Sequence, residues 1–224
     1  GWYTTSNGGT RWDFANTPVE GDMTLYAKWE QHVNTITYDL DGGTNSVNNP
    51  LYYNTNSTAI MLSAPTKEGY SFTGWTGSNG EAPQTAVTVT TEEGGKSYTA
   101  HWQVNQYTIT FDTDGGTAVA SITQDYGSVI TAPVSPTKKE KIFMYWEGLP
   151  YFMPAENITV SARWLNLQKQ EAKAATCLEE GCIEHYTYAG TSYYKEVPAG
   201  DSYIYKLVDA SEVILPKSSH SFGL

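Results

Sequence analysis

Internal repetition limits the folds open to this 224-residue sequence more than any other feature. Three short blocks recur along the chain in a fixed order. The first contains Asp-x-Asp-Gly-Gly and occupies residues 34–44 and again 107–117. The second contains Pro-Thr-Lys, beginning at Pro65 and again at Pro136. The third ends in Trp and occurs three times, at residues 25–29, 98–102 and 160–164.

The order of these blocks predicts the domain organisation. We expect the C-terminal part of a truncated repeat, two complete repeats, and a different C-terminal module with a short linker. These parts are residues 1–30, 31–103, 104–164 and 165–224. The beginning of the last part, residues 165–175, is rich in Gln, Lys, Glu and Ala, which favours a short helix or an extended linker.

Apolar side chains within the blocks alternate with polar ones, as in strands that bury one face. Ile36 and Tyr38 alternate with threonines, and the Trp of each closing block falls on the apolar side. With 17 Tyr, 7 Trp and many Thr, Gly and Asn, this pattern predicts a β-rich chain, all-β to α+β. The Trp residues of two repeat columns are expected to build the cores: Trp2, Trp29, Trp75, Trp102, Trp146 and Trp164.

The Asp-Gly-Gly sequences are typical of tight reversals between antiparallel strands, because Asp and Gly tolerate positive φ. We therefore expect a hairpin to open each repeat. The prolines Pro65, Pro133 and Pro136 predict an irregular connection later in the repeat, with room for one short helical turn.

These blocks resemble the Listeria-Bacteroides repeat, also called the internalin B-repeat. The matching motifs are Ile-Thr-Phe-Asp-x-Asp-Gly-Gly at 109–116, Pro-Thr-Lys-Glu-Gly-Tyr-Ser-Phe-Thr-Gly-Trp at 65–75 and Leu-Tyr-Ala-Lys-Trp at 25–29. The resemblance covers residues 1–164. It implies small β-grasp-like modules strung in tandem in bacterial surface proteins, which serve as spacers or adhesive stalks rather than enzymes.

The third repeat departs from the second. Glu140 and Tyr145 stand where the second repeat has Gly69 and Gly74, and its last two Trp are 18 positions apart rather than 27. We expect a tighter strand pair there. The C-terminal module, in turn, resembles a short tandem unit of clostridial secreted surface proteins, although it lacks the Cys-x-x-Cys-Gly of that unit.

Two groups of residues are candidates for metal binding. The pairs Asp39/Asp41 and Asp112/Asp114 resemble the opening of a calcium loop, but no bidentate Glu follows, so a structural turn is favoured. Cys177, Cys182 and His185, with His220 as a distant fourth ligand, could hold zinc. We favour a disulfide between Cys177 and Cys182, with free thiols as the next alternative, and expect neither a metal nor a cofactor.

The charge balance narrows the range of partners. A net charge of -11 repels phosphate backbones and anionic bilayers, which argues against nucleic acid. No apolar run approaches the roughly 18 residues of a spanning helix, so no membrane insertion of this fragment is expected. The first residues lack the order of a signal peptide, and we interpret the chain as an internal piece of a longer polypeptide.

Catalytic motifs are missing, since the sequence has no G-x-S-x-G, phosphate loop or H-E-x-x-H. We therefore expect a non-catalytic stalk, spacer or adhesive module, extracellular or at the cell surface or cell wall, whose partner is a host or bacterial surface protein or a glycan. The alternative is a carbohydrate- or glycoprotein-binding module of a secreted enzyme. The best place for an aromatic platform is the C-terminal module, with Tyr186, Tyr188, Tyr193, Tyr194, Tyr203 and Tyr205.

The truncated repeat predicts one further property. Residues 1–30 contain a closing strand but no opening strand to cover Trp2, Leu25, Ala27 and Trp29. Exposed strand edges recruit other strands. We therefore expect this segment to dock on the second repeat or to self-associate by strand addition.

Overall fold

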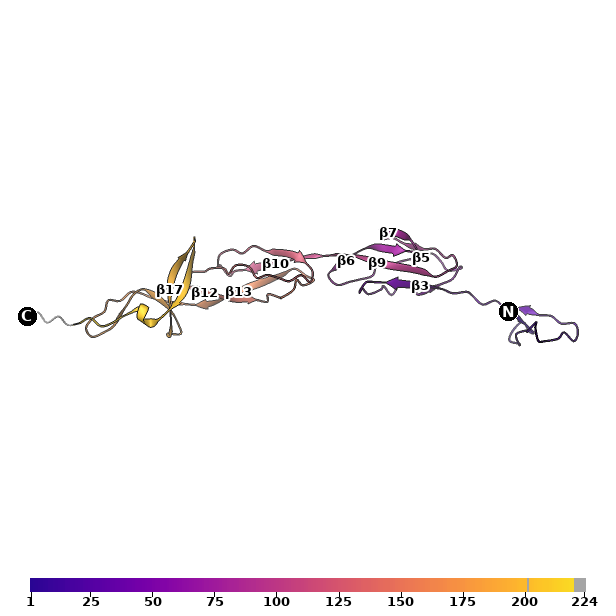
Figure 1. Ribbon diagram of the computed structural model, residues 1–224, viewed down its shortest axis with the longest axis horizontal. Helices are drawn as coiled ribbons and strands as arrows, with labels where there is room; N and C mark the ends of the chain where they lie inside the picture. Colours follow the sequence, from indigo (N-terminus) through magenta and orange to yellow (C-terminus); the bar gives the residue numbers. More distant parts are fainter. Residues whose placement is uncertain (201, 220–224) are drawn as a thin grey trace, which may run out of the picture. The chain divides into compact units, whose positions relative to one another are not determined.

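The computed structural model describes residues 1–200 and 202–219, which divide into two compact units, Gly1–Gln103 and Val104–Leu224. Both units are built from strands (Figure 1). Within the described ranges, the sole helical element is a 3-10 turn, η1, at Ala210–Glu212. The β-rich fold class is therefore confirmed. The connections that contain Pro65, Pro133 and Pro136 are irregular, as expected, and they include isolated bridges but no helical turn.

Residues 1–30 form a two-stranded antiparallel ribbon of β1 (Trp2–Tyr3) and β2 (Tyr26–Ala27). The expectation that Trp2 and Trp29 are core residues is wrong for this segment, since they are 49% and 91% exposed. A ribbon of two short strands has no second layer that could bury the rings. Docking or self-association through this segment stays a prediction.

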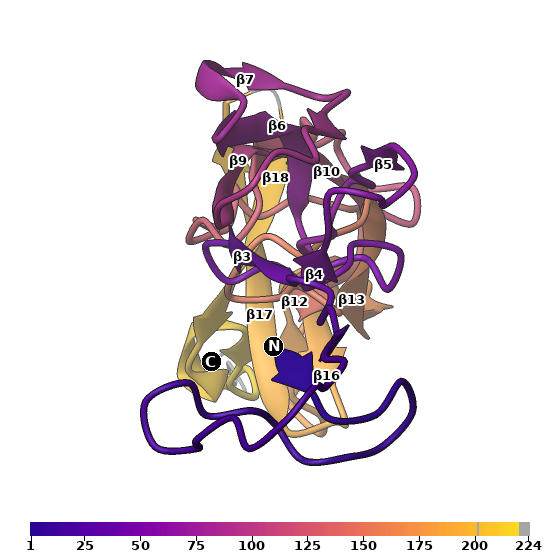
Figure 2. The same ribbon diagram turned by 90° about the vertical axis from the view of Figure 1, so that its right-hand side faces the viewer.

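The second repeat forms a five-stranded sheet in the order β4-β3-β9-β6-β7, which can be followed across the sheet in Figure 2. Its first strand lies parallel to its last long strand, with Ile36 opposite Lys96 and Asp39 opposite Thr99. A separate pair, β5 with β8, completes the repeat. The bounds are β3 Asn34–Asp39, β4 Tyr52–Tyr53, β5 Ile60–Met61, β6 Tyr70–Gly77, β7 Gly80–Gln84, β8 Thr88–Val89 and β9 Lys96–Val104.

The third repeat has the order β11-β10-β13-β12, which is the same arrangement without a counterpart of β7. Its first and last strands are again parallel, with Ile109 opposite Ile158 and Asp112 opposite Ser161. The third repeat thus has a central parallel pair, β10 with β13, flanked by the antiparallel neighbours β11 and β12. The bounds are β10 Gln106–Asp112, β11 Ile122–Asp125, β12 Lys141–Glu147 and β13 Ile158–Asn166.

The C-terminal module contains an antiparallel sheet, β14-β16-β17-β18, and a two-stranded pair, β15 with β19. Its first strand begins at Gln168, so residues 168–170 are neither helix nor free linker but an edge of this sheet. The bounds are β14 Gln168–Gln170, β15 Gly181–Cys182, β16 His185–Tyr188, β17 Ser192–Ala199, β18 Ser202–Val208 and β19 Ile214–Leu215.

Each complete repeat has its own hydrophobic core. Trp75 is fully buried and Trp146 is 8% exposed, and both occupy the same repeat position. Trp102 and Trp164 are partly buried and pack against these cores. The alternation expected of the closing strand holds here, since Tyr98 and Ala100 are buried between more exposed neighbours.

Candidate functional site

The three sequence blocks meet in each complete repeat at one place, which we call the motif corner. In the second repeat it contains the turn 40–43, Lys67 and Trp102. Asp41 and Gly42 have φ of 45° and 80°, and the Gly43 N–H donates to the Leu40 carbonyl over 2.9 Å. The first two strands of each complete repeat pair antiparallel, β3 with β4 and β10 with β11, as expected of an opening hairpin, but the Asp-Gly-Gly turn is not a tight reversal between them. Instead it leads residue 44 into an antiparallel bridge with Thr66.

Side-chain hydrogen bonds and an ion pair connect the three blocks at the motif corner. Lys67 Nζ donates to the Asp41 carbonyl over 2.6 Å and pairs with its carboxylate over 3.1 Å. The Trp102 indole N–H donates to the Leu40 carbonyl over 3.0 Å. A Cβ on Gly43 would lie 2.6 Å from the Trp102 ring, so that position has no room for a side chain. The turn, the Lys and the Trp that recur in the three blocks therefore contact one another directly.

The motif corner of the third repeat has the same bonds. Lys138 donates to the carbonyl of Asp114 and pairs with its carboxylate over 2.9 Å, and Trp164 donates to the Thr113 carbonyl over 3.2 Å. The hydrogen bond from Lys138 holds the pKa of Asp114 below its ordinary value. Each first Asp, Asp39 and Asp112, accepts the backbone N–H of the second. These carboxylates thus have structural partners within the turn.

The two cysteines of the C-terminal module are not bonded to each other. Cys177 and Cys182 are both free thiols, so the favoured disulfide is not formed. Cys182 lies in β15, where its backbone bonds to Lys173 and its Sγ donates to the Glu171 carbonyl over 3.5 Å. His185 is buried and its Nδ1 lies 2.7 Å from the Ile183 carbonyl. His220 lies outside the described residues.

No metal centre is formed by the part of the chain that the structure describes. Within residues 1–200 and 202–219, no three His, Cys, Asp or Glu side chains are grouped so that they could hold one ion.

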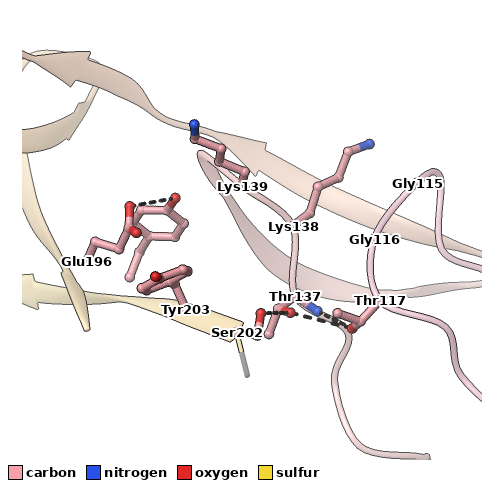
Figure 3. A pocket seen from close by; sticks show the side chains of 10 residues that line it. Gly115, Gly116, Thr117, Thr137, Lys138, Lys139, Glu196, Ser202 and Tyr203 are labelled. Carbon is pink, nitrogen blue, oxygen red and sulfur yellow. Dashed lines mark hydrogen bonds between the residues drawn. The ribbon is translucent and has the colours of Figure 1, made fainter. Parts of the chain in front are cut away.

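A cleft of about 660 Å³ separates the motif corner of the third repeat from the β17–β18 hairpin, and we call it the tyrosine cleft. Figure 3 shows its walls, with Lys138 and Lys139 on one side and Glu196, Ser202 and Tyr203 on the other. The remaining lining residues are Gly115, Gly116, Thr117, Thr137 and Tyr205. The sequence predicts an aromatic platform in this module but carries no signal for the polar groups that face it.

Hydrogen bonds tie the two walls of the tyrosine cleft together. The Glu140 backbone N–H donates to the Tyr205 hydroxyl over 2.7 Å, and the Thr137 and Ser202 hydroxyls are 2.5 Å apart. Tyr205 in turn donates to Glu196 Oε2 over 3.3 Å. Two hydrogen bonds, Glu140–Tyr205 and Thr137–Ser202, therefore link the third repeat to the C-terminal module at the cleft.

The six C-terminal tyrosines have different environments. Tyr186 is buried, packs edge-on against Tyr205 with ring centroids 4.8 Å apart, and donates to Glu196 over 2.8 Å. Burial raises the pKa of both phenols. Tyr188 and Tyr203 are exposed, whereas Tyr193 and Tyr194 are partly buried. The six rings therefore form no single platform, and only Tyr203 and Tyr205 line the tyrosine cleft.

Comparison with known families agrees with the repeat architecture. The Listeria-Bacteroides repeat domain matches residues 1–28, 35–101 and 107–148. These matches fall on the truncated repeat and on the two complete repeats. The chain belongs to this family of tandem-repeat proteins.

Similar curated proteins are longer than this chain. It is 31% identical over 173 residues to a protein named "Putative membrane protein" of Evansella cellulosilytica, covering 73% of the chain and 26% of that protein. A "Putative Gly-rich membrane protein" of the same organism is 33% identical over 149 residues, covering 65% and 17%. Internalin H of Listeria monocytogenes is 43% identical over 77 residues, covering 34% and 13%. The chain thus spans about a quarter or less of these relatives.

No solved structure matches the chain. Among the described residues, there is no helix with the length and hydrophobicity needed to span a bilayer.

Proposed function

We propose that this chain is a non-catalytic spacer segment of a bacterial surface or secreted protein, and that its two complete repeats resist tension. One observation carries the proposal. In each repeat the first strand and the last strand are parallel neighbours in the same sheet, β3 with β9 and β10 with β13.

This arrangement determines how a pulling force acts. Because the paired strands are parallel, the chain enters one at one end of the sheet and leaves the other at the opposite end. Tension along the chain then shears the ladder between them, so several backbone hydrogen bonds must break together. An antiparallel hairpin pulled from its two ends opens one pair at a time. Membership of the Listeria-Bacteroides family and the similarity to Internalin H support a surface location.

Single-molecule force spectroscopy of the whole chain, held at its two termini, tests this function. We expect two discrete high-force events that release roughly 250 Å and 200 Å of chain, because the repeats contain about 73 and 60 residues at about 3.4 Å each. The C-terminal module has only antiparallel pairs among its described strands and provides the control. It should yield at lower force. Equal forces for all three parts, or smooth extension without steps, would contradict the proposal.

A further inference from the structure

The tyrosine cleft has a chemistry that a spacer does not need. Its outermost aromatic group, Tyr203, is 55% exposed at the start of β18, and its hydroxyl makes no hydrogen bond within the described residues. The backbone around it is fixed, since β18 pairs along its length with β17. More than half of this side chain is open to solvent, so part of the ring surface is available to contact a ligand.

Hydroxyl and carboxylate groups lie next to this ring. Ser202 and Thr137 place two hydroxyls at the floor of the cleft, and Glu196 lies on the other side of the Tyr203 ring in Figure 3. Glu196 accepts both tyrosine bonds through Oε2, so Oε1 can accept another. An apolar ring face bordered by donors and acceptors matches a sugar ring, which has an apolar face and a rim of hydroxyls.

The charges of the tyrosine cleft indicate a ligand without net charge. Lys138 is neutralised by its ion pair with Asp114. Lys139 has no ion-pair partner among the described side chains, and Glu196 has none either. Their opposite charges therefore cancel across the cleft. Both groups can still donate or accept hydrogen bonds to hydroxyls.

From this geometry we propose that the tyrosine cleft binds a neutral saccharide, with Tyr203 stacking on the sugar ring and with Glu196, Lys139 and Ser202 bonding its hydroxyls. The volume of about 660 Å³ is in the range of small-ligand sites. Both walls contribute, so the site requires the third repeat and the C-terminal module to be in contact through Glu140 and Tyr205.

Binding to the whole chain is the test. A panel of neutral hexose and N-acetylhexosamine oligosaccharides is screened by saturation-transfer NMR, and affinities are then measured by calorimetry. Tyr203→Ala should weaken binding roughly tenfold, which corresponds to about 1.4 kcal/mol, because it removes the ring that stacks on the sugar. Tyr188→Ala removes another exposed ring of the same module, 44% exposed and outside the cleft, and should leave the affinity unchanged.

Two further results separate this site from other kinds of binding. The affinity of a neutral saccharide should stay nearly constant between low and high salt, whereas binding of a charged ligand by Lys139 would weaken as salt rises. Circular dichroism of each variant checks that the fold is retained. The proposal is overturned if no neutral saccharide binds, if only acidic saccharides bind, or if Tyr203→Ala and Tyr188→Ala have the same effect.

Discussion

The second and third repeats use the same motif corner but differ at one edge of the sheet. In the second repeat β7 lies beside β6, and a Cβ on Gly74 would approach the Gln84 nitrogen to 2.5 Å. The third repeat has no strand at that place, and Tyr145, which replaces Gly74, is 55% exposed. The neighbouring strand, rather than the turn chemistry of the repeat, therefore determines where glycine is required.

The two cores also differ in polarity. The second repeat contains Tyr38 and Tyr98, whereas the third has Phe111 and Val160 at the same positions. The Tyr38 hydroxyl donates to the Pro50 carbonyl over 2.9 Å, so this ring joins the core to a loop. The third repeat must fill the equivalent space with apolar groups alone. The same sheet can thus be stabilised with tyrosines or with apolar side chains at these two core positions.

Removing the central Trp should have the largest effect in both repeats. Trp75→Ala and Trp146→Ala should each cost about 3–5 kcal/mol, with Trp75 at the upper end because it is fully buried. That is a large part of the stability of a small domain. Urea unfolding followed by fluorotryptophan NMR, with Trp102 and Trp164 as reporters, assigns the loss to one repeat.

The matched control for this prediction is Trp29→Ala. Its ring is 91% exposed, so we expect a change within about 0.5 kcal/mol. Wild-type stability of both core variants, or a large loss in the control, would show that the Trp columns do not have these roles.

Gly74→Ala tests the difference at the sheet edge. The added Cβ meets the backbone of β7 and sits at a φ of 146°, so the second repeat should lose about 3 kcal/mol. Tyr145→Ala in the third repeat should cost less than about 1 kcal/mol, because that side chain is mostly exposed. Hydrogen exchange of peptides from β6 and β12 measures both. Similar losses at the two positions would mean that β7 is not the reason for the glycine.

Sequence periodicity could predict the strands and most of the core because these features depend on short-range alternation. Ile36 and Ile109 are buried as expected, and so are Trp75 and Trp146. The parallel neighbour of each first strand was foreseeable only through the family resemblance. Ile36 lies opposite Lys96 and Ile109 opposite Ile158, and pairing between residues so far apart leaves no local signal in the chain.

The errors have similar physical origins. Asp41 and Gly42 do form a tight turn, but the partner of the chain after the turn is Thr66, which local turn chemistry does not specify. Two cysteines five positions apart suggested a disulfide, yet the pairing of β15 with β19 directs the backbone around Cys182. The groups of the tyrosine cleft were missed because Lys139 and Glu196 come from different parts of unit 2.

Alkaline pH should lower the stability of the second repeat more than that of the third. Burial, followed by the nearby Tyr98, raises the pKa of Tyr38 to about 12, and burial also raises the pKa of Tyr98. A raised pKa means that the folded state holds the proton more tightly. The resulting stability is fully present below the ordinary value of about 10 and is lost as the pH rises through the folded value. Phe111 and Val160 cannot ionise, so the third repeat lacks this contribution.

The measurement compares urea unfolding at neutral pH and above about pH 10, again resolved by fluorotryptophan resonances of each repeat. The second repeat should lose more stability than the third. Tyr38→Phe, which copies the residue of the third repeat, should reduce this loss even if it weakens the repeat at neutral pH. An equal loss in both repeats, or no change in the variant, would contradict the link to these phenols.

The smallest effect concerns the residue that precedes β6 and β12. Gly69 and Glu140 occupy this position with φ of 75° and 59°, so the third repeat holds a glutamate in the left-handed region. That conformation costs a non-glycine residue about 1–2 kcal/mol, whereas glycine loses about 0.5–1 kcal/mol more chain entropy on folding. Glu140→Gly should therefore stabilise the third repeat by about 0.5 kcal/mol.

The reverse change, Gly69→Ala, should cost the second repeat about 1 kcal/mol. Glu140→Gly keeps the backbone N–H that donates to Tyr205, so the contact with the C-terminal module should persist. Thermal melts of both variants against the wild type measure the two shifts. If Glu140→Gly destabilises the repeat, the glutamate side chain must contribute more than its strained backbone costs. The third repeat would then have gained a stabilising contact through the same substitution that strains its turn.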